Sequence, residues 1–116
     1  MVNEIDSETL QARLAAGEDV LLVDVRTPAE VAQGAIPNAK HIPMHLLPLR
    51  AGELPQDKDF VLYCRSGARS YHACQFLAQQ GNDKALNLRG GIIAWARHGY
   101  AIGSLTGNGQ GGGQER

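Results

Sequence analysis

The chain has 116 residues, 43% of them hydrophobic, with 11 basic and 12 acidic side chains and a formal net charge of −1. This length fits one domain, and the hydrophobic content excludes a wholly disordered chain. The balanced charge argues against a general nucleic-acid-binding protein, and no apolar run approaches the roughly 20 residues that span a membrane. Residues 1–6 have neither a basic start nor an apolar stretch. We therefore expect no secretory signal and a cytoplasmic location.

The first part of the chain predicts a helix, a buried strand and a second, short helix. Asp6 and Ser7 are both candidate N-caps of an amphipathic helix that ends near Gly17. Residues 20–25 form a nearly continuous apolar run, which is typical of a strand buried on both faces. A short helix is expected from Thr27, because a proline at the next position suits a first helical turn.

The remainder of the chain continues the alternation of strands and helices. Residues 34–43 predict a loop with a short strand at 41–42, and residues 44–49 a helical turn. Further elements are expected as a buried strand at 60–63, a helix at 69–80, a short strand at 85–88 and a helix after Gly90-Gly91. This alternation predicts a parallel sheet covered by helices on both faces.

The composition changes at Gly103, since six of the last 14 residues are glycine. Such a segment buries little, so we expect a domain at 1–102 and a flexible tail at 103–116.

The chain has two cysteines, Cys64 and Cys74. Two are too few for a disulfide scaffold, and their separation by a loop and part of a helix, ten positions along the chain, argues against a direct bridge. None of the four histidines stands at the usual ligand spacing from a cysteine, so we predict no metal site. Those histidines are His41, His45, His72 and His98. Cys74 lies among apolar residues of the predicted helix, which indicates a place in the core.

The segment that carries chemistry is Cys64-Arg65-Ser66-Gly67-Ala68-Arg69-Ser70. It links a buried strand to a helix, at the strand edge where parallel α/β sheets bind ligands. A helix N-terminus and nearby arginines lower the pKa of a cysteine. No proline interrupts residues 65–70, so their N–H groups are free to bind an anion, and glycine at position 67 permits a positive φ.

We therefore predict that Cys64 is catalytic and that the residues after it bind substrate. The predicted substrate-binding residues are Arg65, Ser66, Gly67, Ala68, Arg69 and Ser70. The alternative is that Cys64 is an inert buried residue at a strand end. Two unpaired guanidinium groups beside it favour function, because a buried inert site does not tolerate them.

Residues 64–70 resemble the active-site loop of single-domain rhodaneses, a family of sulfurtransferases. Residues 23–26 with 28–30 are similar to the first motif of that family, and residues 34–39 with 42–43 to the second. Gly90-Gly91, Trp95 and Gly99-Tyr100 resemble its C-terminal motif. The resemblance covers about residues 4–102 and implies a five-stranded, mostly parallel sheet with helices on both faces. The family often has other residues at Ala35, Asn38 and His41, in a loop expected mainly to support the fold.

The resemblance implies a thiosulfate:cyanide sulfurtransferase. The Cys64 thiolate would take a sulfane sulfur from thiosulfate or a related anionic donor, form a persulfide, and pass the sulfur to cyanide or to a thiol, including a protein thiol. Arg65 and Arg69 would attract the donor and stabilise the departing sulfite. No cofactor, nucleic acid or membrane is implied, and His72 is expected on the surface rather than in the reaction.

Two other functions compete with sulfur transfer. Related phosphatases and arsenate reductases place five residues between the cysteine and the arginine, whereas four separate Cys64 from Arg69. Non-catalytic rhodanese-like binding modules usually lack the cysteine, which is present here.

Three further expectations concern structure. We expect Asp24 to make a structural pair or to accept hydrogen bonds from loop backbone, and Arg26 to pair with Glu30 four residues on. We expect Gly90-Gly91 to form a turn packed beside the loop at 64–70, and Trp95 to lie in the core.

Overall fold

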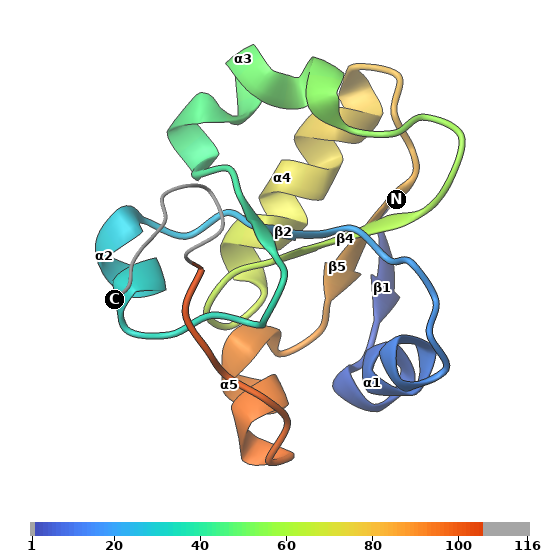
Figure 1. Cartoon of the computed structure of the whole chain (residues 1–116). Coiled ribbons are helices and arrows are strands. Elements are labelled where there is room, and N and C mark those ends of the chain that lie inside the picture. Colours follow the sequence, from blue (N-terminus) through green and yellow to red (C-terminus); the bar gives the residue numbers. More distant parts are fainter. Residues whose placement is uncertain (1, 106–116) are drawn as a thin grey trace.

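The computed structural model describes residues 2–105 and is built on a five-stranded sheet (Figure 1). Its strands are β1 (Asn3–Ile5), β2 (Leu22–Asp24), β3 (Lys40–His41), β4 (Phe60–Tyr63) and β5 (Ala85–Leu88). They lie in the order β1-β5-β4-β2-β3, and every neighbouring pair is parallel. The predicted α/β fold is confirmed, and the sheet is parallel throughout rather than only in most of its strands.

Residues 2–105 form five α-helices, four of which pack on the faces of the sheet. They are α1 (Ser7–Ala15), α2 (Pro28–Ala32), α3 (Leu47–Arg50), α4 (Ala68–Gln79) and α5 (Gly91–Arg97). Short 3₁₀ turns, η1 (Met44–Leu46) and η2 (Ala51–Glu53), flank α3. Figure 1 shows α1 and α5 on one face of the sheet and α3 and α4 on the other. The expected helix starts are confirmed: Asp6 caps α1 by accepting from the N–H of Thr9 at 2.8 Å, and Thr27 and Glu30 form a capping box on α2.

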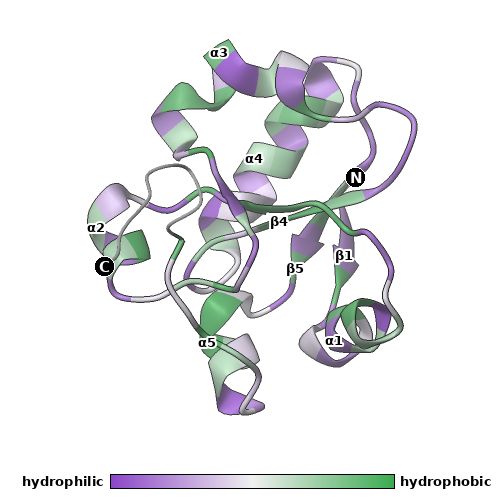
Figure 2. Cartoon of the chain, in the orientation of Figure 1, coloured by the Kyte–Doolittle hydropathy of each residue, from purple (hydrophilic) through white to green (hydrophobic). Residues whose placement is uncertain are grey.

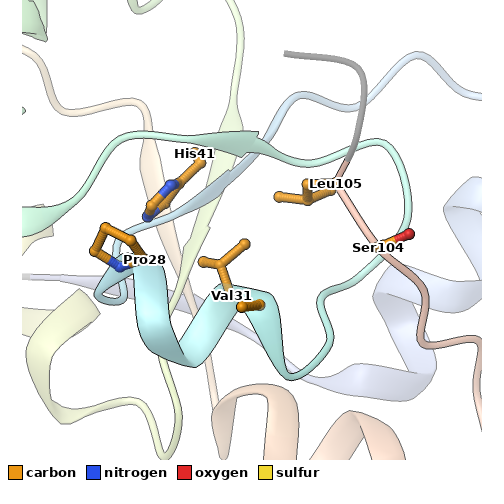
Figure 3. Close-up of a pocket in the computed structure, with 6 residues that line it drawn as sticks. Pro28, Val31, His41, Ser104 and Leu105 are labelled. Carbon is orange, nitrogen blue, oxygen red and sulfur yellow. The ribbon is translucent and has the colours of Figure 1, made fainter. Parts of the chain in front are cut away.

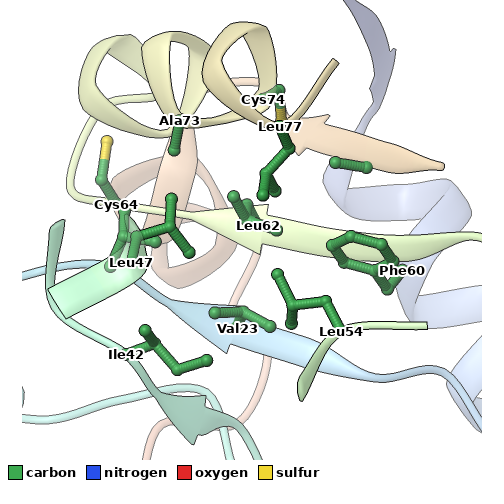
Figure 4. Close-up of a cluster of buried hydrophobic side chains, with 12 residues drawn as sticks. Val23, Ile42, Leu47, Leu54, Phe60, Leu62, Cys64, Ala73, Cys74 and Leu77 are labelled. Atoms are coloured by element: carbon green, nitrogen blue, oxygen red, sulfur yellow. The ribbon is translucent and has the colours of Figure 1, made fainter. Parts of the chain in front are cut away.

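The sheet separates two hydrophobic cores, because successive residues of a strand point to opposite faces. In β4, Phe60 and Leu62 face one core and Val61 and Tyr63 the other. All four are buried, as expected for a central parallel strand, and Figure 2 shows β4 as hydrophobic between helices of mixed character. The first core contains residues of α3 and α4 (Figure 4), and the second contains residues of α1 and α5.

Two strands differ from the sequence-based expectation. The residues alone did not predict β1, which has only three residues, two of them exposed, and so lacks an apolar run. The short strand expected at 41–42 lies at Lys40–His41.

A buried ion pair fixes the chain after β2. Arg26 contacts the Asp24 carboxylate through Nη2 at 2.7 Å and through Nε at 3.0 Å, and its backbone N–H donates to the same carboxylate. Arg26 Nη2 also donates to the Gly34 carbonyl at 2.7 Å. The structural role predicted for Asp24 is therefore confirmed. The expected side-chain pair between Arg26 and Glu30 is wrong: Arg26 reaches only the Glu30 carbonyl oxygen, because the Glu30 carboxylate is engaged elsewhere.

The three positions at which the sequence differs from the usual family pattern lie in the loop before β3 and in β3 itself. Ala35 is fully buried, and Asn38 has a positive φ of 69°, a conformation that asparagine tolerates better than most residues. His41 Nε2 contacts the Arg26 carbonyl oxygen at 2.7 Å. Each residue thus has a local structural role.

The described chain ends close to this loop. Gly103, where the tail was expected to begin, forms an antiparallel bridge with Ala35, with both N–O distances at 2.8 Å. Residues 106–116 lie outside the described residues, so the flexible tail stays a prediction. Within residues 2–105, no helix has the length and apolar character needed to cross a membrane.

Replacing Asp24 tests the buried ion pair. We expect Asp24→Ala to lower the free energy of unfolding by about 3–5 kcal/mol, because it leaves the Arg26 charge buried without its partner. Urea denaturation followed by circular dichroism measures this. Asp19→Ala is the matched control, since the Asp19 side chain is almost fully exposed, and equal stability of the two variants would contradict the assignment.

Candidate active site

Cys64 stands directly after β4, at the carboxyl edge of the sheet where it was predicted. It is only 1% exposed and belongs to the first core, close to Leu47 (Figure 4). The chain then turns into α4 through Gly67, which has a φ of 106°. This left-handed conformation is strained for other residues, so the glycine permits the short connection from strand to helix.

The Cys64 sulfur is surrounded by hydrogen-bond donors from the loop and from the start of α4. The N–H of Gly67 donates to Sγ at 3.1 Å, and the Ser70 hydroxyl lies 3.5 Å from it. Burial raises the pKa of the Cys64 thiol. Hydrogen bonds that the hydroxyl and N–H of Ser70 and the N–H groups of Gly67 and Ser66 can donate to the thiolate oppose burial, and the pKa is lowered overall.

Helix α5 orients the first peptide groups of the loop. The N–H of Ile92 donates to the Cys64 carbonyl at 3.0 Å, and the N–H of Ile93 donates to the Arg65 carbonyl at 3.1 Å. In a trans peptide the C=O and the N–H point in opposite directions. The N–H groups of Arg65 and Ser66 are therefore turned away from α5. The helix thus gains partners for two of its free N–H groups and fixes two peptide planes of the loop.

Asn87 of β5 orients a third peptide group. Its Nδ2 donates to the Gly67 carbonyl at 3.1 Å and to Glu4 Oε2 at 2.9 Å. By the same geometry, the N–H of Ala68 points away from Asn87. Three carbonyls of the loop are thus bound from outside, which leaves N–H groups of the loop free to face an anion.

Gly91 allows α5 to approach the loop. A Cβ atom at this position would lie within 2.7 Å of the Cys64 carbonyl oxygen and closer still to that of Arg65. Its φ of 59° is also in the left-handed region. The prediction that Gly90-Gly91 packs beside the loop is confirmed.

Arg69 is not a free cation, which corrects the expectation of two unpaired arginines. Its Nη1 and Nη2 atoms each lie 2.7 Å from an oxygen of the Glu30 carboxylate, which α2 carries. This pair is the main reason that the pKa of Glu30 is lowered to about 2, so Glu30 is ionised at neutral pH. The positive charge of Arg69 is therefore largely offset.

Arg65, by contrast, is exposed and has no ion pair within residues 2–105. Ser66 and Ala68 are exposed beside it, whereas Ser70 is fully buried. The structure therefore brings all the predicted loop residues around Cys64, with Arg65 as the free cation and Arg69 as a paired one.

The structure also tests the predictions for Cys74, Trp95 and His72. Cys74 is buried in the first core and burial raises its pKa to about 12, as a core position requires. Trp95 is 1% exposed and donates to the Ala101 carbonyl, and His72 is exposed, so both structural assignments are confirmed. Both cysteines are free thiols.

A pocket of about 260 Å³ lies beside α2, between that helix, β3 and the described end of the chain (Figure 3). Its lining consists of Pro28, Val31, Ala32, His41, Ser104 and Leu105. It contains no residue of the loop at 64–70. We therefore place the candidate active site at the loop and not at this pocket.

Comparison with known proteins agrees with this geometry. A family model described as a rhodanese-like domain matches residues 6–98. The chain belongs to the rhodanese-like family. A sulfurtransferase of Allochromatium vinosum is 70% identical over 102 residues, which cover 88% of this chain and 95% of the relative. Such relatives support sulfur transfer as the class of activity.

Solved structures support the same fold. A rhodanese-like domain protein from Staphylococcus aureus is 36% identical, with a TM-score of 0.79 over 89% of this chain and all of that one. A rhodanese-related protein from Thermoplasma volcanium is 31% identical, with a TM-score of 0.79 over 89% of this chain and 99% of that one. The rhodanese-like domain is thus shared by both sequence and structure.

Sequence reasoning did not predict that Asn87 and Glu4 support the loop at residues 64–70, called the rhodanese loop below. It also did not predict the partner of Arg69. Asn87 left a signal, because it is one polar residue in an otherwise apolar strand, Ala85–Leu88. Glu4 and Glu30 are distant in sequence from the groups they contact. Acidic residues are common in segments like theirs, so neither residue gave a signal of its role.

Substituting Gly91 tests whether α5 shapes the rhodanese loop. We expect Gly91→Ala to reduce alkylation of Cys64 at neutral pH, because the new methyl group displaces the carbonyls that orient the loop. Gly99→Ala is the matched control: its φ of 77° is also positive, but nothing lies within 4 Å of an added Cβ. Alkylation followed by mass spectrometry measures both, and equal rates in the two variants would show that only backbone strain matters.

Proposed function

We propose that the protein transfers a sulfane sulfur from thiosulfate or a related anionic donor to cyanide or a thiol, through a persulfide on Cys64. The observation that carries this proposal is the Cys64 sulfur itself, buried at the end of β4 with its pKa lowered by hydrogen bonds. Membership of the rhodanese-like family supports the same chemistry.

The proposed reaction has two steps. The Cys64 thiolate attacks the outer sulfur of thiosulfate, the sulfur–sulfur bond of the donor breaks, and sulfite leaves with the bonding electrons. Cys64 then carries a persulfide, whose terminal sulfur a cyanide ion or a thiolate attacks, and the Cys64 thiolate is regenerated. No general base is needed once the thiolate has formed, because neither nucleophile loses a proton during attack.

The loop supplies what these steps require. A persulfide is anionic at its outer sulfur, and the N–H groups turned inward by α5 and Asn87 are suited to an anion of that size. Because these donors are held by other parts of the fold, they need no rearrangement when charge moves from one sulfur to the next.

The two arginines have different places in this proposal. Arg65 is the free cation at the loop, so it is the one expected to attract the negative end of the donor. Arg69 is held by Glu30 and contributes mainly to the position of the loop. Its engagement by Glu30, together with the four-residue spacing from Cys64, weighs against a phosphatase, in which the arginine must clamp a tetrahedral phosphate.

Intact mass spectrometry tests the persulfide. After brief incubation with thiosulfate, the protein is expected to gain one sulfur atom, which cyanide then removes. Cys64→Ala is expected to abolish this gain because the nucleophile is absent. Cys74→Ala is the control and should keep it, since the Cys74 thiol stays protonated in the core. A sulfur gain in folded Cys64→Ala, or its loss in Cys74→Ala, would contradict the assignment.

Steady-state kinetics test the role of Arg65. Arg65→Ala is expected to raise KM for thiosulfate about two- to fivefold, because the loss of one exposed charge contact weakens binding by about that factor. The KM for the persulfide of a small neutral thiol, which carries one negative charge where thiosulfate carries two, should rise less. Arg97→Ala removes an exposed arginine at the far end of α5 and should leave both values unchanged. A larger effect from Arg97 than from Arg65 would contradict the proposed contact.

A further inference from the structure

A chain of hydrogen bonds runs from the buried Cys64 sulfur through Ser70 and Asn87 to Glu4, an exposed residue of β1 at the edge of the sheet. The Ser70 hydroxyl oxygen lies 3.5 Å from Cys64 Sγ and 2.5 Å from Asn87 Oδ1. Asn87 Nδ2 in turn donates to the Gly67 carbonyl and to Glu4. Ser70 and Asn87 are at most 1% exposed. The sulfur therefore shares the Ser70 hydroxyl with a residue of β5.

The orientation of the Asn87 amide follows from its partners. A carboxylate and a backbone carbonyl can only accept hydrogen bonds, so both must face the NH₂ group of Asn87. The amide oxygen is left to face Ser70. Rotating the amide by half a turn would set its oxygen against two acceptors, which Glu4 and the Gly67 carbonyl prevent.

The Ser70 hydroxyl has one hydrogen for two acceptors. The shorter distance assigns this hydrogen to Asn87, so the hydroxyl oxygen presents a lone pair to Cys64. That arrangement suits a thiol, whose S–H can donate to the oxygen. It does not suit a thiolate, which needs the hydroxyl to turn and donate to it.

We propose that Asn87 is a positioning residue that competes with the Cys64 sulfur for the Ser70 hydroxyl hydrogen and so sets how readily the thiolate forms. The proposal rests on the proposed function in that Cys64 is the nucleophile. On ionisation the thiol proton leaves to solvent, the hydroxyl turns to the sulfur, and the Asn87 oxygen loses its donor in a buried place. This loss disfavours the thiolate.

The charges near Cys64 come from several elements. They are Glu4 on β1 with Arg89 paired to it, Asp24 at the end of β2 with Arg26 paired to it, Glu30 on α2, Arg65 in the loop, and Arg69 on α4. The substitutions proposed below change none of them. A difference in the pKa of Cys64 between these variants therefore reports on the hydrogen bonds and not on a change of charge.

A double-mutant cycle tests the competition. The pKa of Cys64 is measured from the pH dependence of its alkylation by iodoacetamide, with the modified peptide identified by mass spectrometry. Asn87→Ala is expected to lower this pKa by about one unit, a roughly tenfold higher thiolate-to-thiol ratio at a given pH, because the hydroxyl is freed for the sulfur. In the Ser70→Ala background, the same substitution is expected to have no such effect.

A purely structural role for Asn87 predicts a different result. Loss of its bond to the Gly67 carbonyl would loosen the loop and raise the pKa of Cys64 whether or not Ser70 is present. A raised or unchanged pKa in Asn87→Ala, or an equal shift in both backgrounds, overturns the proposal. No sulfur donor enters this experiment, so its outcome is separate from that of the sulfur-transfer test.

A measurement without substitution at Asn87 covers the case in which Asn87→Ala does not fold. The side-chain amide resonances of Asn87 are followed by NMR while Cys64 is titrated. They are expected to move with the pKa of Cys64 in the natural chain, and to move much less in Ser70→Ala, where the hydroxyl that couples the two groups is missing. Equal movement in both proteins overturns the proposal.

Discussion

The direction of the peptide groups between Cys64 and Ala68 is the constraint on which the candidate site depends. A short connection from a strand to a helix has few regular hydrogen bonds to fix these planes; of its carbonyls, that of Gly67 accepts a helical bond from the Tyr71 N–H at 3.1 Å. Here the first N–H groups of α5 and the Asn87 amide bind three of its carbonyls, and trans geometry then turns the corresponding N–H groups to the other side. The site is therefore a consequence of sheet order, because β5 lies next to β4 and leads directly into α5.

The two cysteines show that burial alone does not decide thiol chemistry in this fold. Both belong to the same hydrophobic core and both are at most 3% exposed. Burial raises the pKa of each, and at Cys74 nothing compensates, so its pKa rises to about 12. At Cys64 the donors of the loop and of Ser70 reverse the direction. The difference lies in position, since Cys64 meets the N-terminal end of α4 whereas Cys74 lies within that helix, where backbone N–H groups are already bonded.

Much of the fold could be predicted because its signals are local. The apolar run before Asp24, the proline after Thr27 and the glycines at helix ends each determine an element from a few neighbouring residues. The sequence before Ser7 carried no such signal for β1, whose pairing with β5 gives it its structure. The partners of Arg69 and Asn87 were missed for the same reason, because they lie 39 and 83 residues away in sequence and only the folded sheet brings them together.

The pairing of Arg69 with Glu30 changes how the charge of the site is understood. Counted from the sequence, the loop carries two positive charges. In the fold, the Glu30 carboxylate completes the capping box of α2 and also binds both terminal nitrogens of Arg69. One of the two positive charges is therefore offset by a carboxylate that stays ionised. The attraction that remains comes from Arg65, which is exposed, and from N–H dipoles directed at the sulfur. In the proposed reaction this division is useful: the N–H groups hold the transferred sulfur next to Cys64, while the charged end of the donor meets a cation at the exposed edge of the loop, from which sulfite can leave into solvent.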